Sequence, residues 1–498
     1  MSALILISVF IVATCGIVYE LLAGTLASYL LGDSVLQFST CIGTYMFALG
    51  IGSWISKFFS DKLSLHFIRL QIAIGLIGGL SASILFICFG YTSPSAFRVV
   101  LYLLVIIIGT LCGLEIPLLL RILQDQLNFK DLVSNVLALD YVGSLIASVL
   151  FPLYLVPRLG LVRTACLFGI INVLVAIGFI KLFEIKKSES FMQITKACFA
   201  LLVLAAAFYG ANYITSISEE SLYSDNIIMT RQSPYQRLVI TKHRDDIRLY
   251  LNNNLQFSSQ DEFRYHEALV YPALKSAEHP RKVLILGGGD GLAAREILKN
   301  PEVESITLVD LDPLMTDLFS KHTLLTQLNN NSLSSEKLKI INDDAFVWLG
   351  GCQEKFDTII VDFPDPNNFS VGKLYTTVFY NRLKQHLSPN GACVIQCTSP
   401  MFARRSFWCI VKTIASSGFY TRPYHVYVPS FGEWGYCLAT LRPVDIPECE
   451  GDRFLTKEET RHMFSFPRDL AQLPTEVNKL QNQILVRYYD NEWQAIAE

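Results

Sequence analysis

The residues best suited to chemistry lie in a short stretch of glycines and acids, residues 282–312. An apolar run over 283–286 stops at three consecutive glycines, and 292–299 has helical spacing, which predicts a strand, a tight turn and a helix. A second apolar run ends at Asp310, about twenty residues further on. Glycines let the backbone approach a bound nucleotide, and an acid after the second strand can hold ribose hydroxyls. The pattern therefore predicts a nucleoside site in a doubly wound sheet.

Two details of the turn argue against a dinucleotide. The glycines do not follow the G-x-G-x-x-G spacing, and Asp290 stands in the turn, where it would repel a pyrophosphate. An acid at this place favours a cationic partner. A nucleoside with a positive group, such as an S-adenosyl sulfonium compound with a free amine, fits better, although other Rossmann-like proteins share such turns.

Further acids follow later strands of the same predicted sheet. Asp344 follows the apolar run 338–341, and Asp362 ends the run 357–361. Open α/β sheets bind ligands at the carboxyl ends of their strands, so we expect these acids to meet in one site. Several carboxylates at one site also attract a dication.

Other elements of the polar half would surround this site. Residues 226–256 alternate in period two, which predicts a small antiparallel sheet, and 261–274 is predicted as a helix. The run 392–397 is predicted as a fifth strand of the parallel sheet. The segment 363–375, with two prolines and a glycine, is interpreted as a loop that closes the site.

Composition separates an apolar part of the chain from a polar part. The 498 residues have a formal net charge of -3, which gives no sign of a nucleic-acid partner. The charged residues lie mostly after about residue 215, so the preceding part is far more apolar than a soluble domain. The twelve cysteines include no C-x-x-C pair, and we interpret Cys393 and Cys397 as small buried hydrophobes. No metal is expected.

Residues 1–214 are predicted to form a polytopic α-helical membrane domain. A crossing takes about twenty apolar residues, and about seven segments meet that length. They are 3–24, 37–56, 70–90, 98–120, 133–156, 161–182 and 196–214. The first lacks a basic leading region and a small-residue cleavage site, so we interpret it as a retained helix. Glycines in the second and third segments, Gly43, Gly50, Gly52, Gly75, Gly78 and Gly79, would let helices approach closely.

Three acids fall within these apolar segments, namely Glu20, Glu115 and Asp140. Acids inside a membrane are costly and are functional candidates by default. They could line a path for a cation. Alternatively, each is hydrogen-bonded between helices or lies near an interface.

Basic residues indicate an orientation that conflicts with the predicted site. They concentrate in the links 57–69, 121–132 and 181–196, which the positive-inside rule places in the cytoplasm. With seven crossings, the polar half would then lie outside the cell. An adenosyl metabolite is found in the cytoplasm, so we expect a multi-pass protein of the cell (inner) membrane with a cytoplasmic catalytic domain. Either the rule fails here or one segment does not cross.

Five motifs in the polar half resemble those of one known family. SPYQRLVI, LNNNLQFSSQDEFRYHEALVYPAL, VLILGGGDG, LVDLD and VDFPDP occur in this order over about residues 221–440. Together they resemble the spermidine synthase (polyamine aminopropyltransferase) family. The preceding helices, with GIVYE at 16–20, are similar to those of its multi-pass, membrane-fused branch.

The expected architecture follows from the motifs and this resemblance. A small β-strand subdomain with a helix is expected over 215–275. A Rossmann-like domain of the class I S-adenosylmethionine-dependent transferase type is expected over 276–445, and a helical tail over 446–498. The segment 476–493 has the spacing of an amphipathic helix, which would dock on the domain or on the partner in a homodimer.

The resemblance also implies a reaction and a set of site residues. Decarboxylated S-adenosylmethionine is the expected co-substrate, with no tightly bound cofactor, and putrescine the usual acceptor, giving spermidine and 5'-methylthioadenosine. Asp362 resembles the proton acceptor. By the same resemblance the donor site comprises Gln236, Gln256, Tyr265, His266, Gly287, Asp290, Asp310, Asp344 and Ala345. The acceptor site comprises Tyr265, Asp362 and Asp365.

Departures from the family lie mainly in the acceptor half of the site. Soluble members usually have LDG where this chain has Leu251-Asn252-Asn253, and they have an acid where Thr398 stands. The acceptor could therefore be cadaverine, agmatine, spermidine or a membrane-borne amine. Two other hypotheses stay open: an S-adenosylmethionine-dependent methyltransferase, and a polyamine transporter or sensor whose polar domain only binds. The expected partners are a small polyamine and the lipid bilayer.

Overall fold

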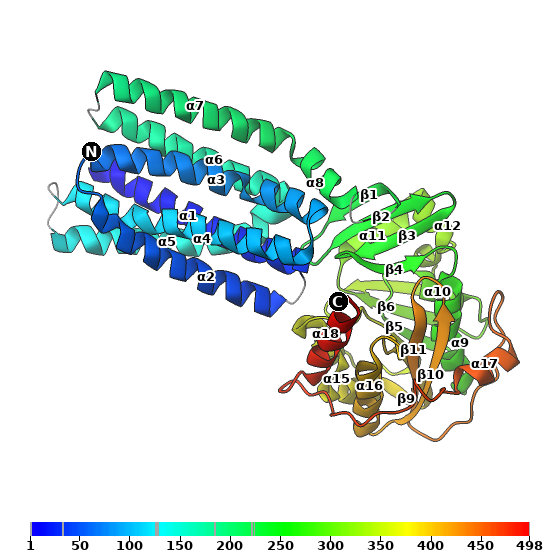
Figure 1. Ribbon diagram of the computed structural model, residues 1–498. Coiled ribbons are helices and arrows are strands. Elements are labelled where there is room, and N and C mark those ends of the chain that lie inside the picture. The colour runs from blue at the N-terminus through cyan, green and yellow to red at the C-terminus, as the bar shows by residue number, and fades with distance from the viewer. Residues whose placement is uncertain are drawn as a thin grey trace. The chain divides into compact units, whose positions relative to one another are not determined.

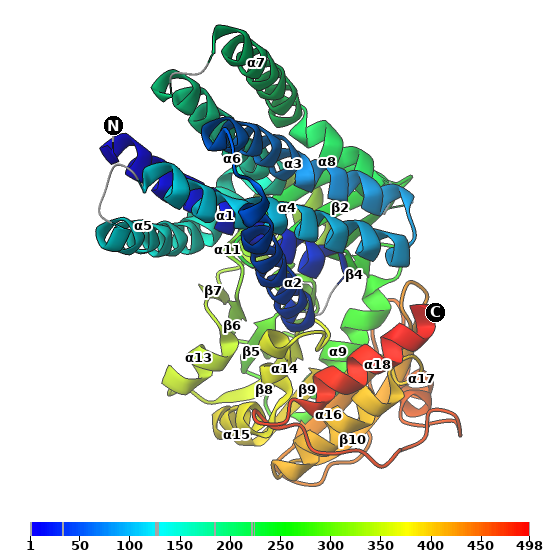
Figure 2. The same cartoon turned by 60° about the vertical axis from the view of Figure 1, so that its left-hand side comes forward.

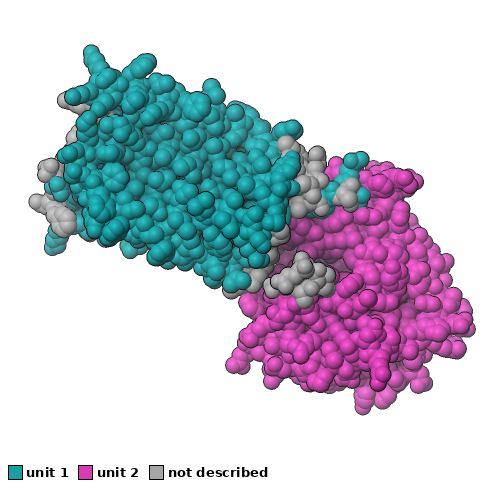
Figure 3. Space-filling view, viewed as in Figure 1, with its two compact units in different colours: residues 1–226 teal, residues 227–498 magenta. Residues whose placement is uncertain are grey.

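The computed structural model describes residues 2–31, 34–124, 129–183, 186–220, 223 and 225–497. The chain divides into two compact units, residues 1–226 and 227–498 (Figure 3). Unit 1 is helical, and unit 2 combines helices with two sheets. Just before the first strand, residues 221, 222 and 224 lie outside the described part of the chain.

Unit 1 is a bundle of long apolar helices (Figures 1 and 2). In chain order they are α1 (Ser2–Leu31), α2 (Ser34–Ile55), α3 (Leu63–Tyr91), α4 (Pro94–Leu123), α5 (Phe129–Leu150), α6 (Val156–Leu182), α7 (Lys187–Tyr209) and the short α8 (Ala211–Glu220). Among the described residues, six stretches are long and apolar enough to cross a membrane.

The fifth of these stretches, Lys130–Leu182, contains two of the segments expected from the sequence. A π-helical turn, Phe151–Leu155, follows α5, and the helical path breaks at Gly160, where φ is 74°. Pro152 and Pro157 lie in this region, and proline removes a hydrogen bond from a helix interior. The stretch is therefore two helices joined by a break.

Glycines allow two helix pairs of unit 1 to pack at short distance. A Cβ atom at Gly52 of α2 would lie 2.1 Å from the carbonyl oxygen of Thr110 in α4. A Cβ atom at Gly75 of α3 would lie 2.7 Å from the carbonyl oxygen of Gly169 in α6. Gly43 does not mark such a close helix contact, because a Cβ atom there would have nothing within 4 Å.

Polar groups inside unit 1 bond to one another across helices. Glu115 of α4 is 4% exposed, and its carboxylate accepts a hydrogen bond from Nε2 of Gln71 in α3 at 2.6 Å. The hydroxyl of Tyr19 accepts one from Asn172 of α6 at 3.1 Å. Glu115 thus forms the kind of interhelical hydrogen bond that the second interpretation expects.

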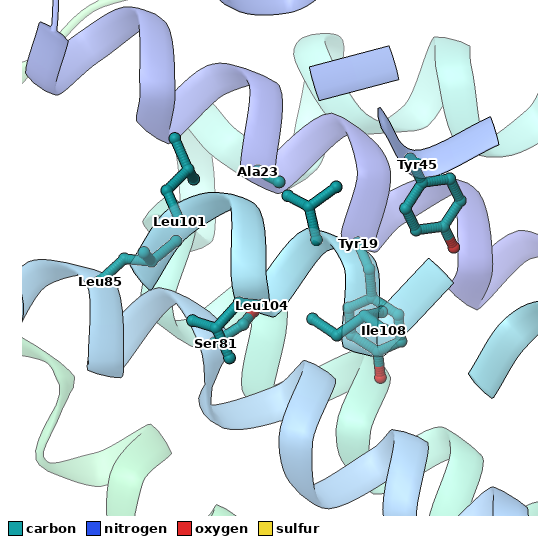
Figure 4. Close-up of a pocket in the computed structure, with 9 residues that line it drawn as sticks. Tyr19, Ala23, Tyr45, Ser81, Leu85, Leu101, Leu104 and Ile108 are labelled. Carbon is teal, nitrogen blue, oxygen red and sulfur yellow. The ribbon is translucent and has the colours of Figure 1, made fainter. Parts of the chain in front are cut away.

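A small cavity lies between α1, α2, α3 and α4 (Figure 4). Its volume of about 10 Å³ is enough for roughly one water molecule. The lining is mostly apolar and consists of Tyr19, Ala23, Tyr45, Ser81, Leu85, Leu101, Leu104, Val105 and Ile108.

Unit 2 begins with a small four-stranded sheet in the order β1-β2-β3-β4. The strands are β1 (Asn226–Gln232), β2 (Arg237–His243), β3 (Asp246–Leu251) and β4 (Asn254–Ser258), and the β2-β3 and β3-β4 pairs are antiparallel. Helix α9 (Glu262–Ser276) follows. This arrangement confirms the antiparallel subdomain and helix predicted from the period-two pattern.

A seven-stranded sheet in the order β10-β11-β9-β8-β5-β6-β7 forms the centre of unit 2. β5 (Lys282–Gly287), β6 (Ser305–Asp310), β7 (Leu338–Asn342), β8 (Phe356–Asp362) and β9 (Leu387–Gln396) run parallel, as predicted. β10 (Tyr420–Val428) and β11 (Gly432–Thr440) add an antiparallel edge that the sequence interpretation did not include. Tyr424 and Tyr436, on that edge, are fully buried and stack at 5.2 Å, so they are core residues.

Helices connect and cover the strands of this sheet (Figure 1). They are α10 (Leu292–Leu298), α11 (Pro313–Lys321), α12 (Thr323–Leu328), α13 (Ala345–Gly351), α14 (Phe369–Gly372), α15 (Thr377–His386) and α16 (Arg404–Ser416). Two 3-10 turns, Ser332–Ser334 and Lys373–Tyr375, complete the connections.

The tail after β11 contains α17 (Lys457–Met463) and α18 (Ile484–Ala497). α18 begins eight residues later than the start of the predicted helix at 476. Asn482 accounts for part of this difference, because its side chain bonds to the backbone at Lys479 and Val477, which competes with helical bonding. The helix packs on α16 of the same domain, where Glu492 accepts hydrogen bonds from the backbone of Arg405 and Ser406.

Candidate active site

The glycine turn and the acids meet at the carboxyl ends of three neighbouring strands. In the parallel register, Gly287 at the end of β5 pairs with Asp362 at the end of β8. On the other side of β5, strand β6 ends at Asp310. The predicted convergence of the glycines and these acids is therefore observed.

Glycine is required in this turn for conformation and for space. Gly287 and Gly288 have φ values of 83° and 66°, which side chains rarely adopt. A Cβ atom at Gly287 would lie 2.1 Å from the carbonyl oxygen of Asp362, and one at Gly289 would lie 2.6 Å from Oδ2 of Asp310. The backbone thus lies directly against both acids.

Asp310 is held by backbone amides. Its Oδ2 accepts a hydrogen bond from N–H of Gly289 at 3.0 Å, and its Oδ1 accepts one from N–H of Asp312 at 2.9 Å. Burial raises the pKa of Asp310 to about 6, although the two amide donors oppose that shift. Asp310 does not cap α11, because that role belongs to Asp312, which accepts from N–H of Leu314.

Asp362 is paired with a tyrosine from α9. The hydroxyl of Tyr265 donates to Oδ1 of Asp362 at 2.6 Å. Burial, with a contribution from the nearby Asp290, raises the pKa of Asp362 to about 6. A carboxylate of this kind can accept a proton near neutral pH more readily than an exposed one.

Asp290 lies in the turn itself and is 8% exposed. Its Oδ1 accepts a hydrogen bond from N–H of Leu292 at 2.9 Å. Burial raises the pKa of Asp290, whereas the charge of His266 opposes that shift.

A buried charge network beneath the turn surrounds His266. Nδ1 of His266 lies 2.8 Å from Oε2 of Glu262, and Arg295 donates to both carboxylate oxygens of Glu262 at 3.0 and 2.9 Å. Burial disfavours the imidazolium, but the hydrogen bond and charge of Glu262 outweigh it and raise the pKa of His266. The network places a cation close to Asp290 and Asp362.

Asp344 and Ala345 lie at the start of α13. Oδ1 of Asp344 caps that helix by accepting from N–H of Phe346 at 2.8 Å, and its Oδ2 pairs with Nζ of Lys373 at 2.5 Å. Lys373 belongs to the segment interpreted as a closing loop. An ion pair therefore ties that loop to the strand-end acids.

Gln236 and Gln256 are placed differently from each other. Nε2 of Gln236 donates to Oδ2 of Asp312 at 2.9 Å, which links the small sheet to the end of β6. Nε2 of Gln256 donates to backbone carbonyls of its own strand β4, at Asn254 and Leu255. Gln236 is thus tied to the strand-end acids by this bond, whereas these bonds of Gln256 stay within strand β4.

Asp365 is surrounded by hydrogen-bond donors. Nε2 of Gln396 donates to its Oδ1 at 2.9 Å, while Thr398 and Tyr489 donate to its Oδ2 at 3.1 and 2.9 Å. Thr398 has a φ of 62°, an uncommon conformation for a β-branched residue. Tyr489 lies in α18, at the far end of the chain.

Comparisons with known proteins agree with this geometry. Residues 262–447 match the model of the spermine/spermidine synthase domain. The chain is 52% identical to a polyamine aminopropyltransferase of Leptospira interrogans serogroup Icterohaemorrhagiae serovar copenhageni, with 100% of both chains covered. This chain belongs to the polyamine aminopropyltransferase family. It is also 36% identical to a polyamine aminopropyltransferase of Mycobacterium tuberculosis, covering 99% of this chain and 96% of that one.

The chain also resembles solved structures of the aminopropyltransferase family. One is a spermidine synthase in complex with the transition state analogue AdoDATO, at 26% identity. That match covers 49% of this chain and 88% of the spermidine synthase chain, with a TM-score of 0.46.

The sequence interpretation of this aminopropyltransferase missed several residues of the site region. Glu262 was not singled out as a site residue, and it is buried and ion-paired with Arg295. Asp312 could have been recognised from the sequence, since it stands two residues after Asp310. Tyr489 could not have been recognised in this way, because it lies 124 residues from Asp365 in the chain. No metal-binding cluster of His, Cys, Asp or Glu occurs among the residues that the structure describes.

Proposed function

We propose that this chain transfers an aminopropyl group from decarboxylated S-adenosylmethionine to a polyamine acceptor, with putrescine as the acceptor and spermidine as the product. The contact that carries the proposal is the hydrogen bond from Tyr265 to Asp362, 2.6 Å long, beside the glycine turn. It supports a role for Asp362 as the proton acceptor. Full-length family members with the same activity in their names support the reaction class.

The reaction is a displacement at the carbon beside the donor sulfonium. A neutral amine nitrogen of the acceptor forms a bond to that carbon, the carbon–sulfur bond breaks, and its electron pair stays on sulfur. The leaving group is the neutral thioether 5'-methylthioadenosine. Asp362 takes the proton that the nitrogen must lose, and the site holds nitrogen and carbon about 3 Å apart.

The donor would lie against the glycine turn. Asp310 is assigned to the ribose hydroxyls, Asp344 with Ala345 to the adenine, and Asp290 to the terminal ammonium of the donor. Gln236, Gln256, Tyr265, His266 and Gly287 complete the proposed donor site. Because Asp290 would repel a carboxylate beside that ammonium, it would also exclude the undecarboxylated donor.

The acceptor would lie between Asp362 and Asp365, with Tyr265 as a third contact. Two carboxylates suit a diamine whose two nitrogens are cations in water. The first must lose a proton to react, whereas the second can stay charged. Cadaverine, agmatine and spermidine are alternative acceptors with the same chemistry.

The decisive experiment is incubation of the full-length protein with decarboxylated S-adenosylmethionine and a panel of amines, followed by product masses. We expect 5'-methylthioadenosine and an amine heavier by one aminopropyl group. Methyl transfer from S-adenosylmethionine would identify a methyltransferase instead. Binding of an amine without release of 5'-methylthioadenosine would identify a transporter or sensor.

We also propose that unit 1 spans the inner membrane. Its six long apolar stretches support this placement. If each of α1 to α7 crosses once, the basic links after α2, α4 and α6 lie on one side and the chain leaves on the other. Because the donor is a cytoplasmic metabolite, we propose that unit 2 lies in the cytoplasm, against the positive-inside rule.

Reporter fusions distinguish the two orientations. A fluorescent protein that folds only in the cytoplasm, fused after residue 498, should be fluorescent, and alkaline phosphatase at the same place should be inactive. The reverse pattern would place unit 2 outside and overturn the proposal. Homodimer formation is a further proposal, tested by the mass of the full-length protein in lipid nanodiscs.

A further inference from the structure

The C-terminal helix brings a hydroxyl group to the acceptor half of the site. Tyr489 donates to Oδ2 of Asp365 at 2.9 Å, and Thr398 donates to the same oxygen at 3.1 Å. With Gln396 on Oδ1, the carboxylate receives three hydrogen bonds. A carboxylate has about four lone-pair directions, so one remains for a ligand.

Asp365 lies close to the proposed base. The buried side chain of Tyr375 is within electrostatic range of both Asp365 and Asp362. The hydroxyl of Tyr375 donates to the carbonyl oxygen of Pro364 at 3.0 Å and to Oε1 of Gln396 at 3.2 Å. Both carboxylates therefore act on one buried tyrosine.

The tail that carries Tyr489 is fixed to the closing loop as well as to the domain. Asn478 is fully buried, and its Nδ2 donates to the carbonyl oxygens of Gly372 and Tyr375 at 3.3 and 3.0 Å. Leu485 of α18 is also fully buried. At the other end of α18, Glu492 accepts from the N-terminal backbone of α16. The hydroxyl of Tyr489 is therefore held in place at both ends of the tail.

We propose that Tyr489 is a positioning residue for the acceptor: it holds Asp365 in the orientation that receives the far ammonium of a diamine. This inference rests on the proposed function. The hydrogen bond from Tyr489 also favours the ionised form of Asp365, which burial disfavours. Without it, the carboxylate can rotate and is more easily protonated, so an ammonium group binds less tightly. A monoamine has no second ammonium and gains nothing from Asp365.

The variant Tyr489→Phe tests this role in the full-length protein. It removes one oxygen and keeps the ring, which contacts Trp493 at 5.8 Å. Hydrogen bonds to charged groups are among the stronger ones in proteins, so we expect the KM for putrescine to rise at least about tenfold. The KM for the donor, and kcat/KM for n-butylamine as a monoamine acceptor, should not change.

Tyr488→Phe is the matched control, because Tyr488 is the preceding residue of the same helix and its ring faces Arg405. It should leave all these constants unchanged. A purely structural role for Tyr489 predicts equal losses for putrescine and n-butylamine, and that result, or no loss at all, would overturn the inference. Thr398→Ala removes the other donor to Oδ2 and should give the same selective loss, even if Tyr489→Phe does not fold. Wild-type protein without any aminopropyl transfer would instead refute the proposed function.

Discussion

The hydroxyl of Tyr265 and Oδ1 of Asp362 lie 2.6 Å apart, although one residue comes from α9 and the other from the end of β8. The bond orients the carboxylate at the point where the glycine turn ends β5. It also stabilises the ionised form of Asp362, which burial disfavours. The acidity of Asp362 is therefore set by two opposing effects that mutation can separate.

The pH dependence of transfer should reflect this balance. The pKa of Asp362 is raised to about 6, and the base must be ionised, so kcat/KM for the acceptor should fall as the pH drops through about 6. Tyr265→Phe removes the donor that favours the ionised form of Asp362. The fall in kcat/KM at low pH, the acidic limb of the pH profile, should therefore move to higher pH. Tyr427→Phe, at a residue 53% exposed on β10, serves as the control. If the acidic limb lies at the same pH in the wild type and in Tyr265→Phe, Tyr265 does not influence the ionisation of Asp362.

Space at the glycine turn should be essential for donor binding. Gly289→Ala places a Cβ atom 2.6 Å from Oδ2 of Asp310, so either the turn or the acid must move. We expect the affinity for the donor to fall by at least about tenfold, measured by calorimetric titration. Gly351→Ala, at a position with nothing within 4 Å, is the matched control and should bind normally. Equal donor affinity in the two variants would contradict the placement of the ligand.

The charge network beneath the site should determine the stability of unit 2. Arg295→Met leaves Glu262 buried without its two guanidinium donors, and removal of one partner of a buried pair costs about 3–5 kcal/mol. Arg405→Met, at an exposed arginine of α16, is the control. Denaturant unfolding of the full-length protein, followed by tryptophan fluorescence, measures the difference. A loss below about 1 kcal/mol would show that the network is dispensable.

The same network predicts how stability changes with pH. Glu262 raises the pKa of His266 from 6.5 to about 9, so the folded chain binds the proton more tightly than the unfolded chain. This contribution is fully present below pH 6.5 and is lost as the pH rises through about 9. The midpoint temperature of thermal unfolding should therefore decrease as the pH rises from 6.5 to 9. The slope should be smaller in His266→Gln, and an identical slope would contradict the assignment.

The ion pair between Lys373 and Asp344 should help to close the loop over the donor. Both side chains are about one-third exposed, so the pair contributes about 1 kcal/mol or less. Lys373→Met should raise the KM for the donor by a factor of about five or less and leave kcat unchanged. This effect should weaken further in high salt. Lys355→Met, at an exposed lysine before β8, should have no effect.

Much of the site could be predicted from the sequence because the chemistry lies close together in the chain. The glycine turn, Asp290 and Asp310 belong to one strand–turn–helix–strand unit, and the parallel pairing of the strands brings Asp362 beside it. The five parallel strands could also be predicted, because the apolar pattern of each strand is local in the sequence. Strands β10 and β11 were missed. Most of β11 is buried without a break, so it lacks the alternation that identifies a half-exposed strand.

Residues joined only by the tertiary fold could not be predicted. Tyr489 reaches Asp365 because α18 packs on α16, and no local pattern specifies that packing. Likewise, Glu262 looks like a solvated helix residue until Arg295 of α10 is placed beside it. In unit 1, hydropathy located the helices, whereas the bond between Gln71 and Glu115 depends on how α3 and α4 pack.

The most direct test of the proposed function compares the wild-type protein with Asp362→Asn in a single turnover. Both are mixed with decarboxylated S-adenosylmethionine and putrescine, and 5'-methylthioadenosine and spermidine are measured by mass. The proposal predicts equal amounts of the two products from the wild type. It predicts a rate at least about a hundredfold lower in Asp362→Asn, with donor binding retained. Undiminished transfer by Asp362→Asn, or no transfer by the wild type, would contradict it.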